Sequence, residues 1–401
     1  MRVVLGVGAG VAAYKVCELL RLFTEAGHAV RVVPTPDSLN FVGAATWAAL
    51  SGQPAVTTAF ESVHEVPHVR IGQDADLVIV APATADLMAR AAAGMSSDLL
   101  TAVLLTARCP VIYAPAMHTE MWEHPATRAN VERLRSYGAL VLEPASGRLT
   151  GADSGPGRLP EPAELFAAAL RVHSRGAADG LARDLAGLSV LVSAGGTRED
   201  IDPVRYLGNR SSGRQGYALA ATAASRGARV ALVAANTELP DPAGVRVIRV
   251  TSARDLRDKV LAEAAAADAI VMAAAVADFR PAQRSRDKIK KTGAPPEPIA
   301  LVENPDVLRE LAGTRPRPGQ VIVGFGAETG DVLANGRAKL AAKGCDLLVV
   351  NQVGNGLAFG TPDNEAVVLG ADGSEVKIPR GPKEALADVV WDLVAARIAR
   401  R

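Results

Sequence analysis

The chain has 401 residues, of which 49% are hydrophobic and 22% charged, and 44 basic and 43 acidic side chains leave a net charge of +1. This length and composition predict two or three globular domains, and the balanced charge argues against a general nucleic-acid-binding protein. Three scattered cysteines exclude a disulfide framework or a cysteine-rich metal site. With no membrane-length apolar run and no signal peptide before the first strand, we expect a cytoplasmic protein.

The first half alternates short apolar runs with helical patterns. Strands are predicted at residues 2–6, 29–33, 77–81 and 111–114, and helices at residues 11–26 and 97–106. The strands end in turns of small residues and proline. This alternation predicts a doubly wound parallel α/β sheet with its working loops along one edge.

The turn after the first strand satisfies a dinucleotide-binding pattern, G-x-G-x-x-A, at Gly8, Gly10 and Ala13. The second strand, however, ends in Pro34-Thr35-Pro36 rather than in the acidic residue that would bind an adenosine ribose. This ending disfavours NAD, and a mononucleotide phosphate at the start of the helix is the better interpretation.

Six motifs of the first half resemble the flavin-dependent cysteine decarboxylase family. They are GVGAGVAAYK from Gly6, HVRI from His68, APATAD from Ala81, AGMSSDLL from Ala93, PAMHTEMW from Pro115 and GRLTGADSGPGRLPEP from Gly147. The resemblance implies a flavodoxin-like domain that binds FMN and decarboxylates a C-terminal or amide-linked cysteine. FMN would oxidise the thiol to a thioaldehyde, CO₂ would then leave readily, and the reduced flavin would return the hydride.

The same resemblance implies roles for individual residues. His68, which would otherwise be read as a loop histidine, matches the histidine that is essential to oxidation of the substrate thiol. The residues expected around FMN and the decarboxylase substrate are Gly8, Gly10, Thr35, Thr84, Asp98, Met117 and His118.

Three positions depart from the family pattern. His118 replaces an asparagine thought to hold the substrate carboxylate, Asp86 replaces a second asparagine, and Gly151 replaces the cysteine that supplies a late proton. A general acid must reach its carbon at hydrogen-bond range, and glycine has no side chain to do so. The candidates for the proton donor are His118, Asp153 and water.

Residues 171–188 are polar and contain Gly and Ala without a clean apolar stripe, which is typical of a connector between cores. We place the boundary near Gly180 and predict domains at residues 1–180 and 187–401.

The second half opens on a long Gly/Arg/Ser loop, residues 197–216, between a strand at 189–193 and a helix at 216–225. Arg205, Arg210 and Arg214 lie among its glycines, an arrangement suited to an anion. Because the loop follows a strand, we expect it over the carboxyl edge of a second sheet. The alternative is a surface turn.

Other strand ends of this half carry charged residues. Residues 270–278 end at Asp278, the basic stretch RPAQRSRDKIKKTGAPP follows from Arg280, and residues 321–325 precede a helix in which Lys339 and Lys343 share a face. In the structural interpretation, a stretch of basic residues such as this one forms a solvent-exposed surface, and Asp278 caps a turn. The functional alternative is a lysine that closes over phosphates during transfer.

This half resembles the phosphopantothenate–cysteine ligases of coenzyme A biosynthesis. The matching stretches are SAGGTREDIDPVRYLGNRSSGRQG from Ser193, AAAVADFRP from Ala273, DKIKK from Asp287, ENPDVL from Glu303, GFGAET from Gly324, KLAAKGCDLLVVN from Lys339 and NEAVVL from Asn364. The resemblance implies that CTP, with Mg²⁺, activates the carboxylate of 4′-phosphopantothenate as an acyl-cytidylate. The amine of L-cysteine then displaces CMP. The resemblance does not imply which residues would bind the Mg²⁺ ion.

Lys288 matches the essential lysine of these ligases, and Arg205 and Asn209 match residues that turn over the acyl-cytidylate. The positions expected to bind CTP are Asp278, Lys288, Pro305, Asp306, Val307, Leu308, Phe325, Lys339 and Lys343.

Taken together, the halves resemble the bifunctional bacterial flavoproteins that ligate cysteine to 4′-phosphopantothenate and decarboxylate the product to 4′-phosphopantetheine. One alternative is a ligase with a decayed flavin domain, and another is a flavin-binding regulatory protein. The resemblance implies a homo-oligomer, with trimers of the flavin domain and dimers of the ligase domain. No nucleic-acid or membrane partner is expected.

Overall fold

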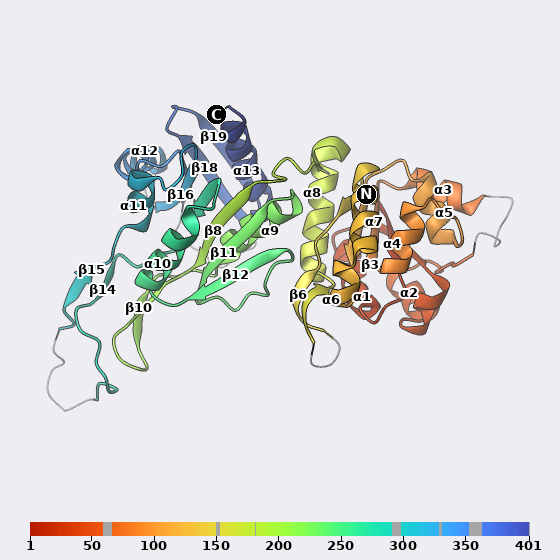
Figure 1. Ribbon diagram of the computed structural model, residues 1–401, viewed down its shortest axis with the longest axis horizontal. Helices are drawn as coiled ribbons and strands as arrows, with labels where there is room; N and C mark the ends of the chain where they lie inside the picture. Colours follow the sequence, from red (N-terminus) through yellow and green to blue (C-terminus); the bar gives the residue numbers. More distant parts are fainter. Residues whose placement is uncertain are drawn as a thin grey trace. The chain divides into compact units, whose positions relative to one another are not determined.

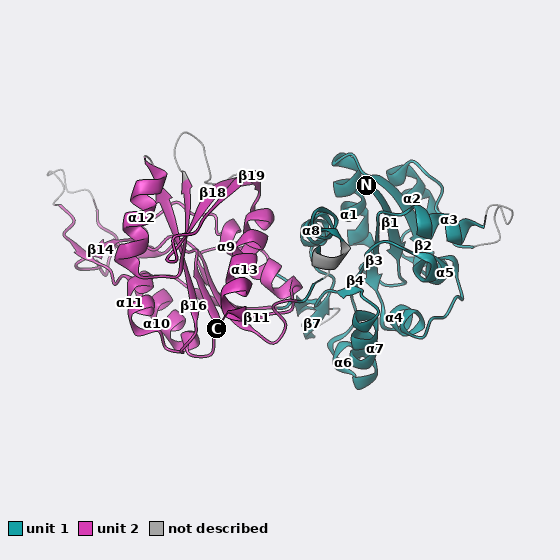
Figure 2. Ribbon diagram, turned by 90° about the horizontal axis from the view of Figure 1, so that it is seen from above, with its two compact units in different colours: residues 1–183, 241–244 teal, residues 184–240, 245–401 magenta. Residues whose placement is uncertain are grey.

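A computed structural model describes residues 1–58, 66–149, 153–180, 182–290, 298–328, 331–352 and 363–400. The chain divides into two compact units, residues 1–183 with 241–244 and residues 184–240 with 245–401 (Figure 2). Each unit is a mainly parallel sheet with helices on both faces (Figure 1). The predicted class, doubly wound α/β, is therefore confirmed for both.

The first unit has a five-stranded parallel sheet in the order β2-β1-β3-β4-β5. Its strands are β1 (Arg2–Val7), β2 (Ala29–Pro34), β3 (Leu77–Ala83), β4 (Val111–Pro115) and β5 (Leu140–Val141). Every residue of β3 is buried, as expected for a central strand covered on both faces. The order is flavodoxin-like, so the carboxyl ends of β1 and β3 flank the point where ligands bind in such sheets.

Helices cover both faces of this sheet. One face packs against α1 (Ala13–Glu25), α2 (Ala44–Ser51) and α8 (Pro162–Gly180). The other packs against α3 (Pro67–Asp74), α4 (Ala85–Ala92), α5 (Leu99–Thr106), α6 (Thr119–Glu123) and α7 (Pro125–Ser136). A short 3₁₀ helix, η1 (Pro36–Asn40), follows β2, and β6 (Ala145–Arg148) pairs antiparallel with β7 (Ser154–Arg158).

Helix α8 extends into the region predicted to be a connector. It continues to Gly180, with a break at Gly176, whose φ is 77°. Val172 is fully buried in the core of the first unit. The prediction of a linker that starts at Arg171 is therefore wrong over residues 171–180, which continue the helix and begin with two buried residues, Arg171 and Val172.

The second unit has an eight-stranded sheet in the order β12-β11-β8-β13-β16-β17-β18-β19. The strands are β8 (Ser189–Gly195), β11 (Arg229–Ala235), β12 (Val245–Val250), β13 (Ala269–Met272), β16 (Val321–Glu328), β17 (Leu347–Gln352), β18 (Asp363–Gly370) and β19 (Glu375–Pro382). The first six strands in this order run parallel, and β18 and β19 are added antiparallel at one edge.

Two layers of helices enclose the second sheet. Helices α9 (Arg214–Ser225) and α13 (Lys383–Ala399) pack on one face around Trp391. Helices α10 (Ala253–Ala264), α11 (Val307–Thr314) and α12 (Val332–Lys343) cover the other (Figure 1). None of the described helices of the chain combines the length and apolar character needed to cross a bilayer.

Two small antiparallel ribbons follow strands of the second sheet. They are β9 (Arg198–Asp200) with β10 (Tyr206–Gly208), and β14 (Phe279–Pro281) with β15 (Leu301–Glu303). The loop predicted at residues 197–216 therefore contains a hairpin, whose three-residue strands are too short to give a recognisable alternation of apolar residues.

Candidate active sites

A cavity of about 950 Å³ opens among the loops that follow the parallel strands of the second sheet. Its lining includes Asn209, Arg210, Arg214, Gln215, Asp278, Glu303, Pro305, Asp306, Val307, Leu308, Phe325, Lys339, Lys343, Asn351, Asn364 and Lys383. The carboxyl ends of parallel strands share one edge of a sheet, which explains why segments so distant in sequence meet here. Every residue predicted to bind CTP, except Lys288, lines this cavity.

The turn after β13 forms part of the cavity wall and is held by side chains from three segments. Thr197 Oγ1 accepts a hydrogen bond from Ala277 N at 2.9 Å, and Asn209 Nδ2 donates to the Val276 carbonyl at 3.0 Å. Asn304 Nδ2 donates to the Ala277 carbonyl at 2.8 Å. These bonds fix the backbone that leads to Asp278.

The two lysines of α12 are ion-paired at the cavity wall. Lys339 Nζ lies 3.0 Å from Glu328 Oε1, and Lys343 Nζ lies 2.5 Å from Asp306 Oδ2. A Cβ on Gly326 would lie 3.3 Å from Lys339 Cδ, so glycine leaves room for the lysine stem along β16. The predicted common face is confirmed, and these lysines are not freely solvated.

Sequence reasoning missed Lys383, which lies at the start of α13 and is 5% exposed. Its Nζ donates to the Asp363 carbonyl at 2.9 Å. Burial lowers the pKa of Lys383, while Glu384 opposes this shift and the positive charge of Arg214 adds to it. A signal was present in the sequence, because a cation in the first turn of a helix faces the unfavourable end of the helix dipole.

The charges around the cavity favour an anion. The basic side chains in the lining are Arg210, Arg214, Lys339, Lys343 and Lys383, and the acidic ones are Asp278, Glu303 and Asp306. The start of α9 adds backbone N–H groups, which lack partners within their own helix. Phosphate-bearing ligands fit this surplus of positive charge.

Lys288 and Arg205 do not line the cavity. Lys288 is exposed and lies beyond β14. Arg205 lies in the hairpin between β9 and β10, where its Nη2 is 2.6 Å from Asp202 Oδ2. The structure therefore places both residues outside the cavity lining, with Arg205 bonded to the Ile289 carbonyl of the segment that carries Lys288.

A second, smaller pocket of about 260 Å³ lies at the carboxyl ends of β1, β2 and β3 in the first unit. Its lining is Ala9, Thr35, Pro36, Asp37, Thr84, Asp86, Leu87, Arg90, Ser97 and Asp98. Three of the residues predicted around FMN, Thr35, Thr84 and Asp98, thus come together. Carboxylates outnumber the one guanidinium, so hydroxyl donors fit this pocket better than a bare phosphate does.

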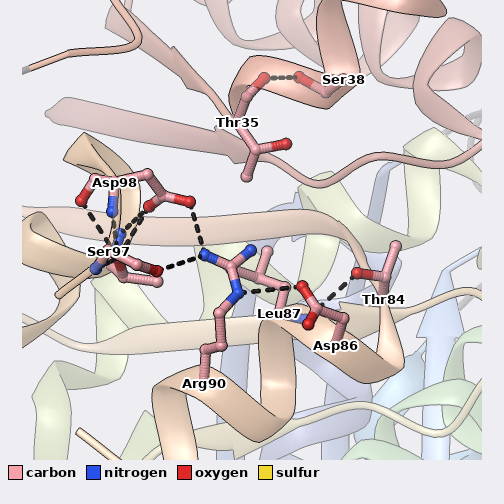
Figure 3. A network of polar contacts seen from close by, with 9 residues as sticks. Thr35, Ser38, Thr84, Asp86, Leu87, Arg90, Ser97 and Asp98 are labelled. Atoms are coloured by element: carbon pink, nitrogen blue, oxygen red, sulfur yellow. Dashed lines mark hydrogen bonds and ion pairs between the residues drawn. The ribbon is translucent and has the colours of Figure 1, made fainter. Parts of the chain in front are cut away.

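Arg90 organises one wall of this pocket (Figure 3). Its Nε lies 2.9 Å from Asp86 Oδ2, and its Nη1 lies 2.7 Å from Asp98 Oδ2 and 3.0 Å from Ser97 Oγ. Asp98 also caps α5 in a capping box with Thr101. Burial alone would raise the pKa of Asp98, but hydrogen bonds from Thr101 and Arg90 outweigh it and hold that pKa below its ordinary value.

Thr35 presents an unused hydroxyl to the same pocket. The residue is buried, and its Oγ1 has no hydrogen-bond partner among the described residues. Its carbonyl accepts from Ser38 Oγ at 2.7 Å, and Figure 3 shows the Thr35 hydroxyl directed away from that contact. Leaving a buried hydroxyl unpaired costs about 1–3 kcal/mol, which a polar ligand in the pocket would recover.

The other predicted pocket residues have structural roles. Thr84 Oγ1 accepts from Leu87 N at 3.3 Å and caps α4. Gly8 N donates to the Pro82 carbonyl at 3.1 Å, and a Cβ on Gly8 would lie 2.4 Å from that oxygen. Glycine is therefore required there for close approach of two loops. A Cβ on Gly10 would make ordinary contacts at 3.7 Å.

His68 is not brought into this pocket. It lies in α3, where its carbonyl accepts from Thr106 Oγ1 at 2.8 Å. Its Nδ1 is buried without a hydrogen-bond partner in the described part of the chain. The predicted thiol-oxidation residue is therefore not among the residues that line the pocket.

Met117 and His118 likewise lie outside the pocket, at the start of α6. Met117 N donates to the Gly157 carbonyl at 2.9 Å, which attaches β7 to this segment. A Cβ on Gly157 would lie 2.1 Å from the Met117 carbonyl oxygen, so only glycine permits that contact. Gly151, the position of the missing family cysteine, lies outside the described residues.

Comparison with known proteins gives the family. Residues 1–173 match the family model described as Flavoprotein, and residues 185–398 match DNA/pantothenate metabolism flavoprotein C-terminal domain. The chain is 58% identical over 405 residues to the coenzyme A biosynthesis bifunctional protein CoaBC of Mycolicibacterium smegmatis, which covers 98% of this chain and 97% of that one. A Vibrio parahaemolyticus protein of the same name is 40% identical over 391 residues, 96% of each chain.

Among solved structures, the chain is similar to the crystal structure of the C-terminal domain of a CoaBC protein, with 30% sequence identity and a TM-score of 0.47. The match covers 55% of this chain and 100% of the chain in that structure. The whole-chain identities and the two family models decide the assignment. This chain belongs to the family of bifunctional enzymes of coenzyme A biosynthesis, in which a flavoprotein domain precedes a ligase domain.

Proposed function

We propose that residues 187–401 join 4′-phosphopantothenate to L-cysteine with CTP, and that residues 1–180 decarboxylate the product with FMN to 4′-phosphopantetheine. The observation that carries the ligase assignment is the positively charged cavity in which Asn209 and the nucleotide-binding candidates meet. The observation that carries the flavin assignment is the unpaired Thr35 hydroxyl in a pocket at the carboxyl edge of a flavodoxin-like sheet.

In the first ligase step, a carboxylate oxygen of 4′-phosphopantothenate attacks the α-phosphorus of CTP and pyrophosphate leaves. Lys339 and Lys343, already held at the cavity wall by their carboxylate partners, offset the charge of the nucleotide. Asp278, Phe325 and the segment from Pro305 to Leu308 hold the rest of the nucleotide. Lys288 is assigned to bind the phosphates that leave as pyrophosphate.

Mg²⁺ is assigned to the phosphate oxygens of CTP, the usual arrangement in nucleotide-dependent transfer. Within the ranges that the structure describes, no group of three or more His, Cys, Asp or Glu side chains is placed to hold a metal ion. A substrate-borne metal needs no such group.

In the second ligase step, the cysteine amine attacks the acyl carbon, a C–N bond forms, the C–O bond to the phosphate breaks, and CMP leaves as the amine loses its proton. Asn209 is assigned to this step because its amide is bonded to the turn before Asp278, which is part of the cavity wall. Arg205 shares the assignment with it.

In the decarboxylase, bound FMN would supply the oxidation of the thiol and its reversal. Thr35 and the carboxylates of Asp86 and Asp98 would accept or share hydrogen bonds with the hydroxyls of the ribityl chain. His68 would take up the thiol proton. The last proton would come from His118, Asp153 or water, since Gly151 has no side chain for it.

The proposed assembly has dimers of the ligase domain and trimers of the flavin domain. The two ribbons of the second unit expose apolar side chains that a second copy would cover: Val204, Tyr206, Leu207, Phe279, Leu301 and Val302. In the first unit, the separation of His68 from the pocket lining supports a site that another copy completes.

The ligase assignment is tested by pyrophosphate release in the presence of CTP, Mg²⁺ and 4′-phosphopantothenate. Lys288→Gln should abolish this release, because it removes a charge that the departing phosphates need. The matched control is Lys290→Gln, two residues away and also exposed, which should keep the wild-type rate. Unchanged release in the Lys288 variant would refute its role.

A further inference from the structure

One carboxylate is buried in an otherwise exposed loop of the second unit. Asp202 lies in the turn between β9 and β10, and its side chain is fully buried, whereas that of Arg205 is 50% exposed. Val204, in the same turn, is 60% exposed. A carboxylate that is removed from water must accept several hydrogen bonds to remain charged. The donors around Asp202 therefore show which segments this turn connects.

The two oxygens of Asp202 have different partners. Oδ1 accepts from the backbone N–H groups of Val204 and Arg205, each at 2.8 Å, and so closes the turn. Oδ2 accepts from Arg205 Nε at 3.0 Å and Nη2 at 2.6 Å, and from Ile289 N at 3.2 Å. Oδ2 therefore links the arginine to a segment that is distant in sequence.

These donors keep Asp202 charged. Burial opposes ionisation, but hydrogen bonds from Val204, Arg205 and Ile289 outweigh it and hold the pKa of Asp202 well below its ordinary value. The link is therefore present at any pH near neutrality.

The backbone N–H and the backbone carbonyl of Ile289 are both hydrogen-bonded to the hairpin. Its N–H donates to Asp202, and its carbonyl accepts from Arg205 Nη2 at 2.6 Å. Ser285 N also donates to the Ile201 carbonyl at 2.9 Å, so the hairpin is bonded on both sides of Lys288. Because the Lys288 side chain is exposed and long, these backbone bonds determine the region that its ammonium can reach.

We propose that Asp202 is a positioning residue of the ligase, which holds Arg205 and the backbone beside Lys288 in one fixed arrangement. The inference rests on the proposed ligase function and extends it. Arg205, assigned to turnover of the acyl-cytidylate, and the backbone that follows Lys288, assigned to nucleotide activation, share this one carboxylate, so its loss should disturb both.

The test is Asp202→Asn, which keeps the shape of the side chain and one oxygen for the turn. The NH₂ group of the new asparagine would face the Arg205 guanidinium and the Ile289 N–H. All three groups are hydrogen-bond donors, so none of them could accept a bond from another. We expect tryptic cleavage between Lys288 and Ile289 to become about tenfold faster, since the bonds that restrain this backbone are lost. We also expect kcat for pyrophosphate release to fall roughly 10- to 100-fold, with KM for CTP unchanged within about twofold.

The matched control is Asp200→Asn in the same hairpin. Asp200 Oδ2 lies 2.9 Å from Arg284 Nη2, and both side chains are exposed, so its loss should change the rates by less than about twofold. Thermal unfolding of Asp200→Asn should match the wild type, whereas Asp202→Asn should unfold at a lower temperature but remain folded at the temperature of the assay. The double variant Asp202→Asn/Arg205→Gln should be no slower than Arg205→Gln alone, because both changes break one link.

Wild-type cleavage and kcat in Asp202→Asn would overturn the inference, as would fully additive losses in the double variant. Faster cleavage with an unchanged kcat would also overturn it, by showing that the link has no role in the reaction. Failure of the wild-type protein to release pyrophosphate would instead refute the proposed function, so the two failures are distinguishable.

Discussion

The two units of the chain carry similar sheets but assemble their candidate sites to different degrees. In the second unit, Asn209 and the nucleotide-binding candidates other than Lys288 line one cavity of about 950 Å³. In the first, Thr35, Thr84 and Asp98 line a pocket of about 260 Å³, while His68 and Met117 lie elsewhere. The cavity of the second unit collects residues from segments after its parallel strands and from helix α12, whereas in the first unit neither His68 on α3 nor Met117 after β4 joins the pocket.

The two sites also differ in charge. The cavity of the second unit has more basic than acidic lining side chains, and the pocket of the first unit is lined by three carboxylates and one guanidinium, that of Arg90. The first arrangement suits triphosphate and acyl-phosphate groups, and the second suits neutral hydroxyls. Because the two sites lie in different compact units, changes at one should leave the ligand of the other bound, and the following variants examine this independence.

The largest effect is expected for Gly8→Ala. The new Cβ would lie 2.4 Å from the Pro82 carbonyl oxygen, a backbone atom that cannot move without shifting the loop after β3. We expect the free energy of unfolding of the first unit to fall by about 1–3 kcal/mol and flavin to be lost, with CTP-dependent pyrophosphate release retained. Flavin absorbance, thermal unfolding and pyrophosphate release measure the three quantities.

Gly43→Ala is the control for Gly8→Ala, because a Cβ at Gly43 would meet no atom within 4 Å. This variant should keep its flavin. If Gly8→Ala abolished pyrophosphate release as completely as it removed flavin, the two sites would not be independent.

An intermediate effect is expected for Lys339→Met, which keeps the apolar stem but removes the charge that pairs with Glu328. A hydrogen bond to a charged group contributes about 1.5–3 kcal/mol, so KM for CTP should rise roughly tenfold or more. Flavin content should not change. Steady-state kinetics provide the measurement, with Arg337→Met on the exposed side of α12 as control.

The smallest effect is expected for Thr35→Val, which replaces the unpaired hydroxyl by a methyl group of similar size. Flavin affinity should fall by a factor of up to about ten, because one neutral hydrogen bond contributes about 0.5–1.5 kcal/mol. The flavin-free form should be no less stable than wild type. Titration of the apoprotein with FMN would measure this, and unchanged affinity would remove Thr35 from the flavin site.

Much of the fold could be predicted from the sequence because buried parallel strands are continuous apolar runs followed by small-residue turns. The resemblance to the ligases implied the site residues, and the structure places Asp278 between β13 and β14 and Phe325 within β16. Lys383 was not predicted, because its place in the first turn of α13 marks it as unusual but does not show that β18 and β19 return the chain to the cavity. The link from Asp202 to Ile289 is a tertiary contact that no local pattern reports.

The measurement that tests the two-activity assignment most directly is the mass of the product formed from 4′-phosphopantothenate, L-cysteine, CTP and Mg²⁺ by the purified flavin-bound protein. If both units work, 4′-phosphopantetheine accumulates and CO₂ is released. Accumulation of phosphopantothenoylcysteine alone would contradict the decarboxylase, and would leave a ligase whose flavin domain has lost its chemistry at His118 and Gly151.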